Sequence, residues 1–271
     1  MATRPLRFAD RVVIVTGGSK GIGEGVVRVF MREGGRVVFT ARGAEAGNKL
    51  QDELNTTFPQ GKALFVKCDM TNQVDVQAMV ERTVETFGRL DCLINNAGWH
   101  PPPTKIDDIS VEDFRSLLDF NLVSYFFTMK FALPHLRKVK GSIINMSSLT
   151  AVIGQSDAVS YVATKGAITS MTKALAVEEA RHGVRVNVVS PGNIWTPLWD
   201  SFASAGTDEQ RTANIKAGEE AQLLGRMGSL EESGELCLYL AAEATFTTGV
   251  DHLLSGGAEL NYGKKTMLPA E

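Results

Sequence analysis

A tyrosine and a lysine stand four residues apart in this chain, at Tyr161 and Lys165. On a helix, side chains at this spacing share a face, with Cβ atoms about 5–6 Å apart. A free phenol has a pKa of about 10, and a neighbouring ammonium group lowers it by stabilising the phenolate. The pair therefore predicts a proton-transfer site, where Tyr161 takes a proton from an alcohol or gives one to a carbonyl. Of the four tyrosines, only this one has a lysine four residues further on.

Two polar residues before Tyr161 could complete the site. Ser148 follows an apolar run at 142–146 that predicts a buried strand, and parallel sheets bind ligands at the carboxyl ends of their strands. Its hydroxyl could donate to the substrate oxygen, or it could only cap the turn. Asn121 lies in the otherwise apolar stretch LLDFNLVSYFF. Its amide could hold a water molecule that relays protons to Lys165, or it could bond to a neighbouring helix.

The first predicted strand, at 12–15, runs into the glycine-rich turn TGGSKGIG at 16–23. Glycine lets backbone amides approach a phosphate, and the N-terminus of the following helix adds unpaired N–H groups and partial positive charge. A tight turn without a ligand could use the same glycines, but strand, turn and helix come here in the order that a dinucleotide site requires. The turn residues predicted to bind the cofactor are Gly17, Lys20, Gly21, Ile22 and Gly23.

The end of the second predicted strand, at 37–39, bears on the choice of cofactor. Sites for NAD place a carboxylate about 20 residues after the glycines, where it binds the ribose 2′-hydroxyl. This chain has Ala41 there, followed by Arg42, and Lys20 lies in the turn. Two cations without an acid attract a 2′-phosphate. We therefore expect NADP(H) to be favoured, with NAD(H) as the alternative if Arg42 is only a solvated surface residue.

Two later segments are predicted to flank the same cofactor. Asp69 follows the third predicted strand and could bind the adenine amino group, although it could equally cap the next helix. The stretch Asn95-Asn96-Ala97-Gly98 closes the fourth predicted strand, beside the expected position of the cofactor ribose. Within it we expect contacts from Asn95, Ala97 and Gly98, unless the glycine only ends the loop.

Short apolar runs alternate with helical patterns along the chain. The runs are nearly continuous, as in strands that are buried on both faces of a parallel sheet. This order predicts a single-domain, doubly wound (Rossmann) α/β fold over residues 1–271, with about seven parallel strands and helices on both faces. Residues 191–228 are longer than an ordinary connection and predict an insertion at the substrate site. The predicted strands cover 12–15, 37–39, 63–66, 90–94, 142–146, 184–189 and 250–254, and the predicted helices 22–33, 44–57, 73–87, 110–138, 161–182 and 230–242.

The composition narrows the possible functions. A net charge of −3 gives no general attraction to nucleic acid or to an anionic membrane. No run approaches the ~20 apolar residues of a membrane span, and the four histidines are too far apart to predict a metal site. Three cysteines, an odd number, indicate free thiols in a reducing compartment. We expect a cytoplasmic protein whose partner is a small-molecule substrate.

The order and spacing of these motifs, together with Pro191-Gly192, resemble the short-chain dehydrogenase/reductase family over residues 9–260. The resemblance implies an NAD(P)-dependent enzyme that acts on CH–OH groups. It implies a catalytic tetrad and further cofactor contacts after the sixth strand. The tetrad residues are Asn121, Ser148, Tyr161 and Lys165, of which the last two also bind the cofactor, and the further contacts are Pro191, Gly192, Ile194 and Thr196.

The same resemblance implies a homotetramer. The predicted helix at 110–138 is too apolar for an isolated surface, since Phe120, Leu122, Phe126 and Phe127 lie close together on it. The alternative is that all four side chains face the sheet.

Within that family, AGWHPPP (97–103), SYVATKGA (160–167), SPGNIWTPLW (190–199), LGRMG (224–228) and SGGAELNYG (255–263) are similar to 17-beta-hydroxysteroid dehydrogenases that prefer NAD. This similarity implies a steroid alcohol or ketone as substrate. An L-fucose-like sugar is the alternative, and a non-catalytic dinucleotide sensor is a more distant one. The tryptophans favour an apolar ring unless they only pack the core, whereas His100 and Gln155 could equally bind sugar hydroxyls. The implied substrate residues are His100, Ser148, Gln155, Trp195, Trp199 and Tyr262.

Overall fold

The computed structural model describes residues 4–204 and 206–261, and its centre is one parallel sheet. Seven strands lie in the order β3-β2-β1-β4-β5-β6-β7, so the chain winds outward from β1 in both directions. The predicted doubly wound α/β fold is thereby confirmed. The strands are β1 (Val12–Val15), β2 (Arg36–Ala41), β3 (Lys62–Lys67), β4 (Cys92–Asn95), β5 (Ser142–Met146), β6 (Arg185–Pro191) and β7 (Asp251–Leu254).

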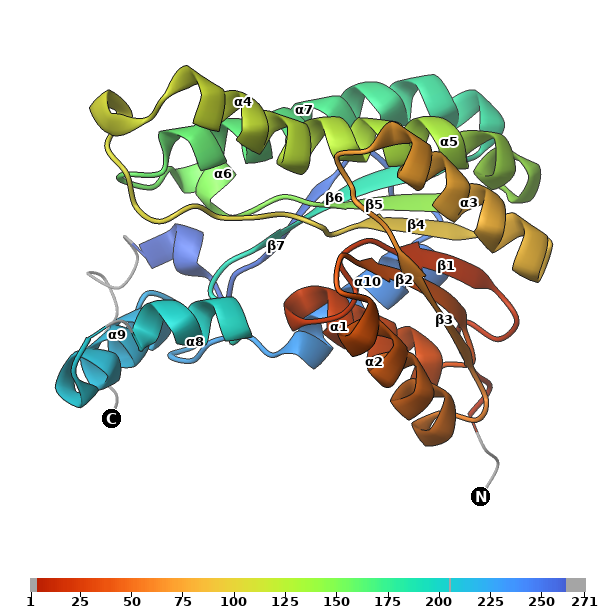
Figure 1. Cartoon of the computed structure of the whole chain (residues 1–271), viewed down its shortest axis with the longest axis horizontal. Coiled ribbons are helices and arrows are strands. Elements are labelled where there is room, and N and C mark those ends of the chain that lie inside the picture. Colours follow the sequence, from red (N-terminus) through yellow and green to blue (C-terminus); the bar gives the residue numbers. More distant parts are fainter. Residues whose placement is uncertain (1–3, 205, 262–271) are drawn as a thin grey trace.

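Helices cover both faces of this sheet (Figure 1). One face carries α1 (Gly21–Arg32), α2 (Ala44–Thr57) and α10 (Leu230–Ala242). The opposite face carries α3 (Gln73–Phe87), α5 (Ser124–Val139) and α7 (Val159–Glu179). The shorter elements are α4 (Val111–Leu118), α6 (Thr150–Ile153), α8 (Pro197–Ala203) and α9 (Asp208–Glu220), with 3-10 turns at Ile106–Asp108 and Ala180–His182.

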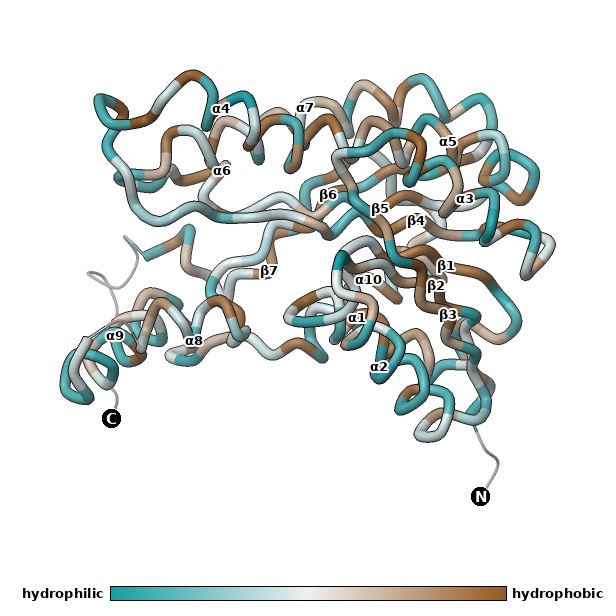
Figure 2. Tube along the Cα trace, viewed as in Figure 1, coloured by the Kyte–Doolittle hydropathy of each residue, from teal (hydrophilic) through white to brown (hydrophobic). Residues whose placement is uncertain are grey.

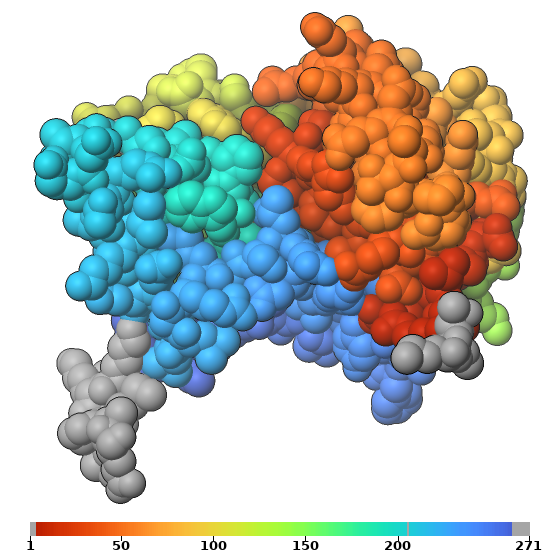
Figure 3. Space-filling model, turned by 90° about the horizontal axis from the view of Figure 1, so that it is seen from below, coloured from red at the N-terminus to blue at the C-terminus, as the bar shows by residue number. Residues whose placement is uncertain are grey.

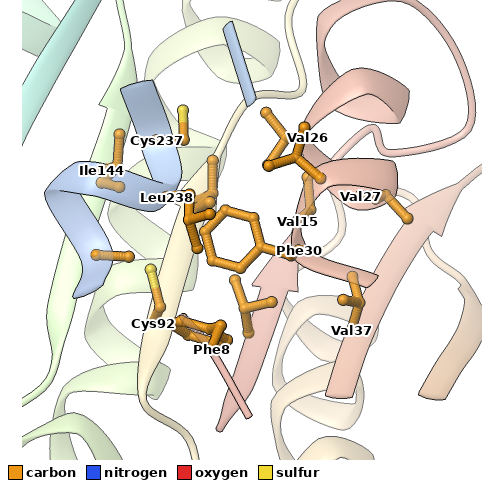
Figure 4. Packing of buried hydrophobic residues seen from close by; sticks show 14 of the residues in the cluster. Phe8, Val15, Val26, Val27, Phe30, Val37, Cys92, Ile144, Cys237 and Leu238 are labelled. Carbon is orange, nitrogen blue, oxygen red and sulfur yellow. The ribbon is translucent and has the colours of Figure 1, made fainter. Parts of the chain in front are cut away.

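The strand side chains alternate between two hydrophobic cores. On β1, Val13 and Val15 belong to the core under α1 and α10, whereas Val12 and Ile14 belong to the core under α3, α5 and α7. Figure 4 shows Phe30 of α1 within the first core. Both faces of the strands are therefore apolar, which explains the continuous hydrophobic runs and the brown colour of the central strands in Figure 2.

The helix predicted at 110–138 contains a π-helical turn. Helix α4 continues through the π turn Asp119–Val123 into α5, and this turn carries Asn121. Single π turns inside α-helices are frequent at functional sites, because the wider turn re-aims the side chains within it. The sequence pattern did not predict this, since one wide turn shifts the hydrophobic period only slightly.

The segment 191–228 contains α8 and α9, followed by a connection to α10. Seen from below, these two helices (cyan) lie at one end of the molecule, away from α2 in orange (Figure 3). Thr196 caps α8 by accepting from the N–H of Trp199, and Thr207 forms a capping box with Gln210 at the start of α9. Within the described part of the chain, every helix is too short or too polar to span a lipid bilayer.

Candidate active site

A cleft of about 370 Å³ lies at the carboxyl ends of the central strands. Ligands of doubly wound sheets bind at this edge. The cleft brings the predicted phosphate turn and the predicted proton-transfer pair into one space. Its walls are Gly17, Ser19 to Ile22, Thr40 to Arg42, Cys68, Met70, Asn96 to His100, Phe120, Met146, Ser147, Tyr161, Lys165, Pro191 and Thr196 to Leu198.

The glycine turn has the geometry of a phosphate cradle. Gly17 and Gly21 have φ angles of +65° and +59°, a region that favours glycine. A Cβ at Gly23 would stand 2.3 Å from the carbonyl oxygen of Gly17, so this position also excludes a side chain. Lys20, the N-cap of α1, makes no side-chain cap, which leaves the first amides of the helix available to an anion. These residues fit the pyrophosphate of a dinucleotide.

Ala41 and Arg42, at the end of β2, both line the cleft. Arg42 is exposed, and its guanidinium carbon lies 5.9 Å from the centroid of the Phe120 ring, which keeps the charge at the cleft wall. Lys20 is also exposed and lines the same cleft. No acidic side chain is among the wall residues of the cleft in the described part of the chain.

Asp69 lies just after β3, but it does not cap the next helix. The N-cap of α3 is Asn72, whose side chain accepts from the N–H of Val74. Asp69 instead accepts from the N–H and the hydroxyl of Thr71, at 3.0 and 2.8 Å. These bonds lower the pKa of Asp69, and Arg42 adds a smaller attraction. Asp69 is therefore an exposed, ionised carboxylate, and it is not among the wall residues of the cleft.

Tyr161 and Lys165 lie on α7, as the spacing predicts. Lys165 is buried, its Nζ lies 5.8 Å from the centroid of the Tyr161 ring, and it donates to the carbonyl oxygen of Met146 at 2.9 Å. Burial lowers the pKa of Lys165 to about 8 and raises the pKa of Tyr161 to about 12. The tyrosine pKa is thus not lowered, contrary to the sequence-based expectation, because desolvation outweighs the opposing hydrogen bond from Ser148. Further positive charge in the cleft is needed to stabilise the phenolate.

Ser148 follows β5 and is nearly buried. A hydrogen bond from its side chain to Tyr161 opposes the effect of burial and favours the phenolate. Ser148 also bonds within its own turn, where it accepts from the N–H of Thr150 at 3.2 Å. Ser148 therefore bonds within its turn, as in the capping alternative, and also bonds to Tyr161.

Asn121 is fully buried in the π turn and bonds to two other segments. Its Oδ1 accepts from the N–H of Trp99, and its Nδ2 donates to the carbonyl oxygen of Trp99, both at 2.9 Å. Nδ2 also lies 3.2 Å from Oγ1 of Thr164 on α7. The amide therefore ties the 98–100 loop to α7 and also makes the bond to a neighbouring helix that the alternative expected. A Cβ at Gly98 would lie 3.3 Å from Nζ of Lys165, so this loop passes close over the lysine.

Asn95 does not reach the cleft, contrary to expectation. It is fully buried beneath the sheet, where Nδ2 donates to Asn145 at 2.9 Å and Oδ1 accepts from Thr128 at 2.5 Å. Its neighbour Asn96 lines the cleft and donates to the carbonyl oxygens of Thr16 and Gly17 at 2.9 and 3.2 Å. Successive strand residues point to opposite sides, so the polar pair was visible in the sequence but its orientation was not.

Of the predicted contacts after β6, Pro191 and Thr196 line the cleft. Gly192 and Ile194 are not among its wall residues. Gly192 donates its N–H to Leu254, and Ile194 is buried, where it forms an isolated bridge with Gly228. Both residues hold the segment that carries Thr196.

Of the implied substrate residues, His100 lines the cleft and lies beside Gln155, which is not among the wall residues. The ring of His100 lies 4.1 Å from that of Tyr161, and its Nε2 lies 3.4 Å from Oε1 of Gln155. Trp195 and Trp199 stack on each other at 5.7 Å and are not among the wall residues.

Other apolar side chains take the place expected for the two tryptophans. Trp199 packs against α9, where a Cβ at Gly218 would meet its ring at 2.3 Å. The apolar wall comes from Leu198 and Trp99, and Phe202 lies 6.0 Å from His100. Tyr262 lies outside the described residues.

The fold and the cleft are those of a dinucleotide-dependent dehydrogenase. Residues 17–259 match the family model described as Enoyl-(Acyl carrier protein) reductase. The chain belongs to the short-chain dehydrogenase/reductase family, whose members oxidise CH–OH groups or reduce the corresponding carbonyls with a nicotinamide cofactor.

Several similar proteins are named for sugar substrates. The chain is 51% identical to an L-fucose dehydrogenase of Bos taurus, over 98% of this chain and 96% of that one. An L-fucose dehydrogenase of Mus musculus is also 51% identical, over 96% and 92% of the two chains. The structure of an L-sorbose reductase from Gluconobacter frateurii, complexed with NADPH and L-sorbose, has a TM-score of 0.88 at 27% identity and covers 94% of this chain and 98% of that one. The family prediction is confirmed, but these names support the sugar alternative better than the steroid expectation.

Proposed function

We propose that this enzyme is a sugar dehydrogenase that oxidises a hydroxyl of L-fucose or of a sugar with similar stereochemistry. The identity of 51% to L-fucose dehydrogenases, over nearly the whole of both chains, carries this proposal. The cleft offers a suitable polar group in His100, whose ring lies 4.1 Å from that of Tyr161 and whose Nε2 lies 3.4 Å from Oε1 of Gln155. Ring nitrogens and an amide can both donate to and accept from sugar hydroxyls.

The protein's own residues would position the sugar and move its proton. Tyr161 takes the hydroxyl proton at its phenolic oxygen, and Ser148 donates to the same substrate oxygen. Lys165 binds the cofactor ribose and adds positive charge near the phenolate. A bound nicotinamide would supply the hydride acceptor for the substrate carbon. The glycine turn and the 96–98 segment hold the reactants in place, which replaces a collision between two molecules by an ordered contact.

The test follows the absorbance of reduced nicotinamide while purified enzyme is mixed with each substrate and each oxidised cofactor. The panel contains L-fucose, D-arabinose, D-glucose, a 17β-hydroxysteroid and cyclohexanol. We expect the highest kcat/KM for L-fucose or for the pentose that shares its ring stereochemistry. A steroid with a higher kcat/KM than every sugar would contradict the proposal. Cofactor binding without turnover of any substrate would instead support the sensor alternative.

A steroid alcohol is the second candidate, and one feature of the cleft favours it. Leu198 and Trp99 are exposed and line the cleft, and the exposed Phe202 lies 6.0 Å from His100. Exposed apolar side chains around a cleft are typical of apolar ligands. The same wall could also pack against the methyl group of a 6-deoxy sugar such as L-fucose, so it does not separate the two substrates by itself.

NADP(H) remains our proposed cofactor, with NAD(H) as the alternative. The support is that Arg42 and Lys20 both line the cleft, and that no acidic side chain is among its described wall residues. The cytoplasm remains our proposed compartment, because all three cysteines are free and buried, which is compatible with reducing conditions.

We also keep the homotetramer as a proposal, with a smaller set of contact residues. Phe120, Leu122 and Phe127 pack against the core under α5 and α7. These three side chains therefore face the protein interior and are not available for subunit contacts. Phe126 is 52% exposed on α5, and Val177 is 79% exposed on α7. Light scattering at micromolar concentration should give the mass of four subunits, and a mass of one subunit would rule the assembly out.

A further inference from the structure

Ser148 has a hydroxyl neighbour that no sequence motif singled out. Thr150 is the first residue of α6, and its Oγ1 lies 2.9 Å from Oγ of Ser148. The backbone N–H of Thr150 donates to the same serine oxygen at 3.2 Å. Among the described residues, Oγ1 of Thr150 makes no other hydrogen bond. The serine oxygen can therefore accept from both donors of Thr150.

This arrangement fixes the direction of the serine proton. A hydroxyl group has two acceptor lone pairs and one hydrogen to donate. When both lone pairs of the Ser148 oxygen are occupied, the hydroxyl can interact with a further partner only by donating its hydrogen. We propose that Thr150 is a positioning residue, which holds the Ser148 hydroxyl as a donor toward Tyr161 and the substrate oxygen.

The Thr150 side chain is not needed to build the turn. The backbone of this turn is held by other bonds, from the N–H of Leu149 to Pro191 at 2.9 Å and from the N–H of Ala151 to Ser148 at 3.0 Å. Helix α6 contains no buried residue. Removing the hydroxyl should therefore change the orientation of the Ser148 proton while leaving the fold and the cofactor cleft intact.

The effect should appear in the pH dependence of oxidation. The bond between Ser148 and Tyr161 lowers the pKa of the tyrosine. A hydrogen bond to the charged form favours that form, so a less well oriented serine lets the pKa rise. Oxidation needs the phenolate, and its pH profile should then move to higher pH.

The opposite polarity is also chemically conceivable and predicts the opposite result. If Ser148 donated its hydrogen to Thr150, the threonine would compete with the substrate oxygen for that proton. Removal of the threonine hydroxyl would then increase kcat/KM and move the profile to lower pH. The sign of the change therefore separates the two arrangements.

The experiment compares Thr150→Val with Thr150→Ser, and it rests on the proposed dehydrogenase reaction. Valine keeps the shape and removes the hydroxyl, serine keeps the hydroxyl, and Val152→Ala serves as the control on the exposed surface of α6. If Thr150→Val does not fold, Thr150→Ala replaces it. Each variant is assayed from pH 6 to 10 with L-fucose and with cyclohexanol, and its affinity for the cofactor and its thermal midpoint are measured.

We expect Thr150→Val to lower kcat/KM by about three- to tenfold, the range of one neutral hydrogen bond, and to move the profile up by about half a pH unit. Thr150→Ser and Val152→Ala should match the wild type, with cofactor affinity unchanged throughout. Equal effects of valine and serine, no effect of valine, or a gain in kcat/KM would each overturn the proposal. A wild type that oxidises cyclohexanol but not L-fucose contradicts only the sugar assignment, and the Thr150 comparison is then made on cyclohexanol.

Discussion

We propose that two neighbouring residues at the end of β2 set the cofactor preference, and exchanging them should reverse it. In the double variant Ala41→Asp, Arg42→Ala, a carboxylate stands where the 2′-phosphate of NADP would bind, and the guanidinium is lost. The carboxylate repels the phosphate and offers an acceptor for the 2′-hydroxyl of NAD. We expect the ratio of kcat/KM values to move toward NAD.

The size of the shift follows from the exposure of Arg42. A charge-assisted hydrogen bond contributes about 1.5–3 kcal/mol, which is roughly a tenfold to hundredfold preference. Arg42 is exposed and stands at the cleft wall over Phe120, so salt and water screen its charge. We therefore expect the wild type to prefer NADP by about tenfold or less, and the double variant to prefer NAD by a similar factor.

The assay measures kcat/KM for both cofactors at low and at high salt. Arg42→Lys keeps the charge but loses the planar fork, and it should retain only part of the preference. Lys49→Ala removes an exposed cation of α2 that is not a cleft wall residue, and it should change neither cofactor. A wild type that already prefers NAD by tenfold or more would show that Arg42 points to solvent and that the charge argument is wrong.

Three further perturbations test the site and the fold. Tyr161→Phe should reduce turnover by ~10²–10⁴ or more while cofactor affinity stays nearly unchanged, since only the proton-transfer group is lost; near-normal turnover would refute its role. Lys165→Met should weaken both turnover and cofactor binding, and an unchanged cofactor Kd by fluorescence titration would exclude contact with the ribose. Arg137→Met removes the partner that lowers the pKa of the buried Glu179, so chemical denaturation at pH 7 should show a loss of roughly 2 kcal/mol, less than for a fully buried pair. Because the folded pKa is lowered, this stability is present above the unfolded pKa and lost as pH falls through the folded value; a difference that persists at pH 3 would refute the ion-pair explanation.

Local sequence patterns were enough to predict most of the fold. Strands β1 and β5 and helices α2, α3 and α10 have the predicted bounds, and the other strands differ by one or two residues at their ends. A strand buried on both faces must be apolar throughout, and a phosphate turn must use glycine, so each leaves a pattern that is readable without its neighbours. Tyr161 and Lys165 were predictable for the same reason, because their spacing places them on one face of one helix.

The tertiary structure decided the features that depend on residues far apart in the chain. It turned Asn96 rather than Asn95 toward the cleft, and it brought Leu198 and Trp99 to the wall where two other tryptophans were expected. The raised pKa of Tyr161 could not be predicted from the sequence, because it results from burial by all the surrounding segments together. Spacing along the chain determines which groups share an element, whereas orientation and desolvation come from the elements that pack around them.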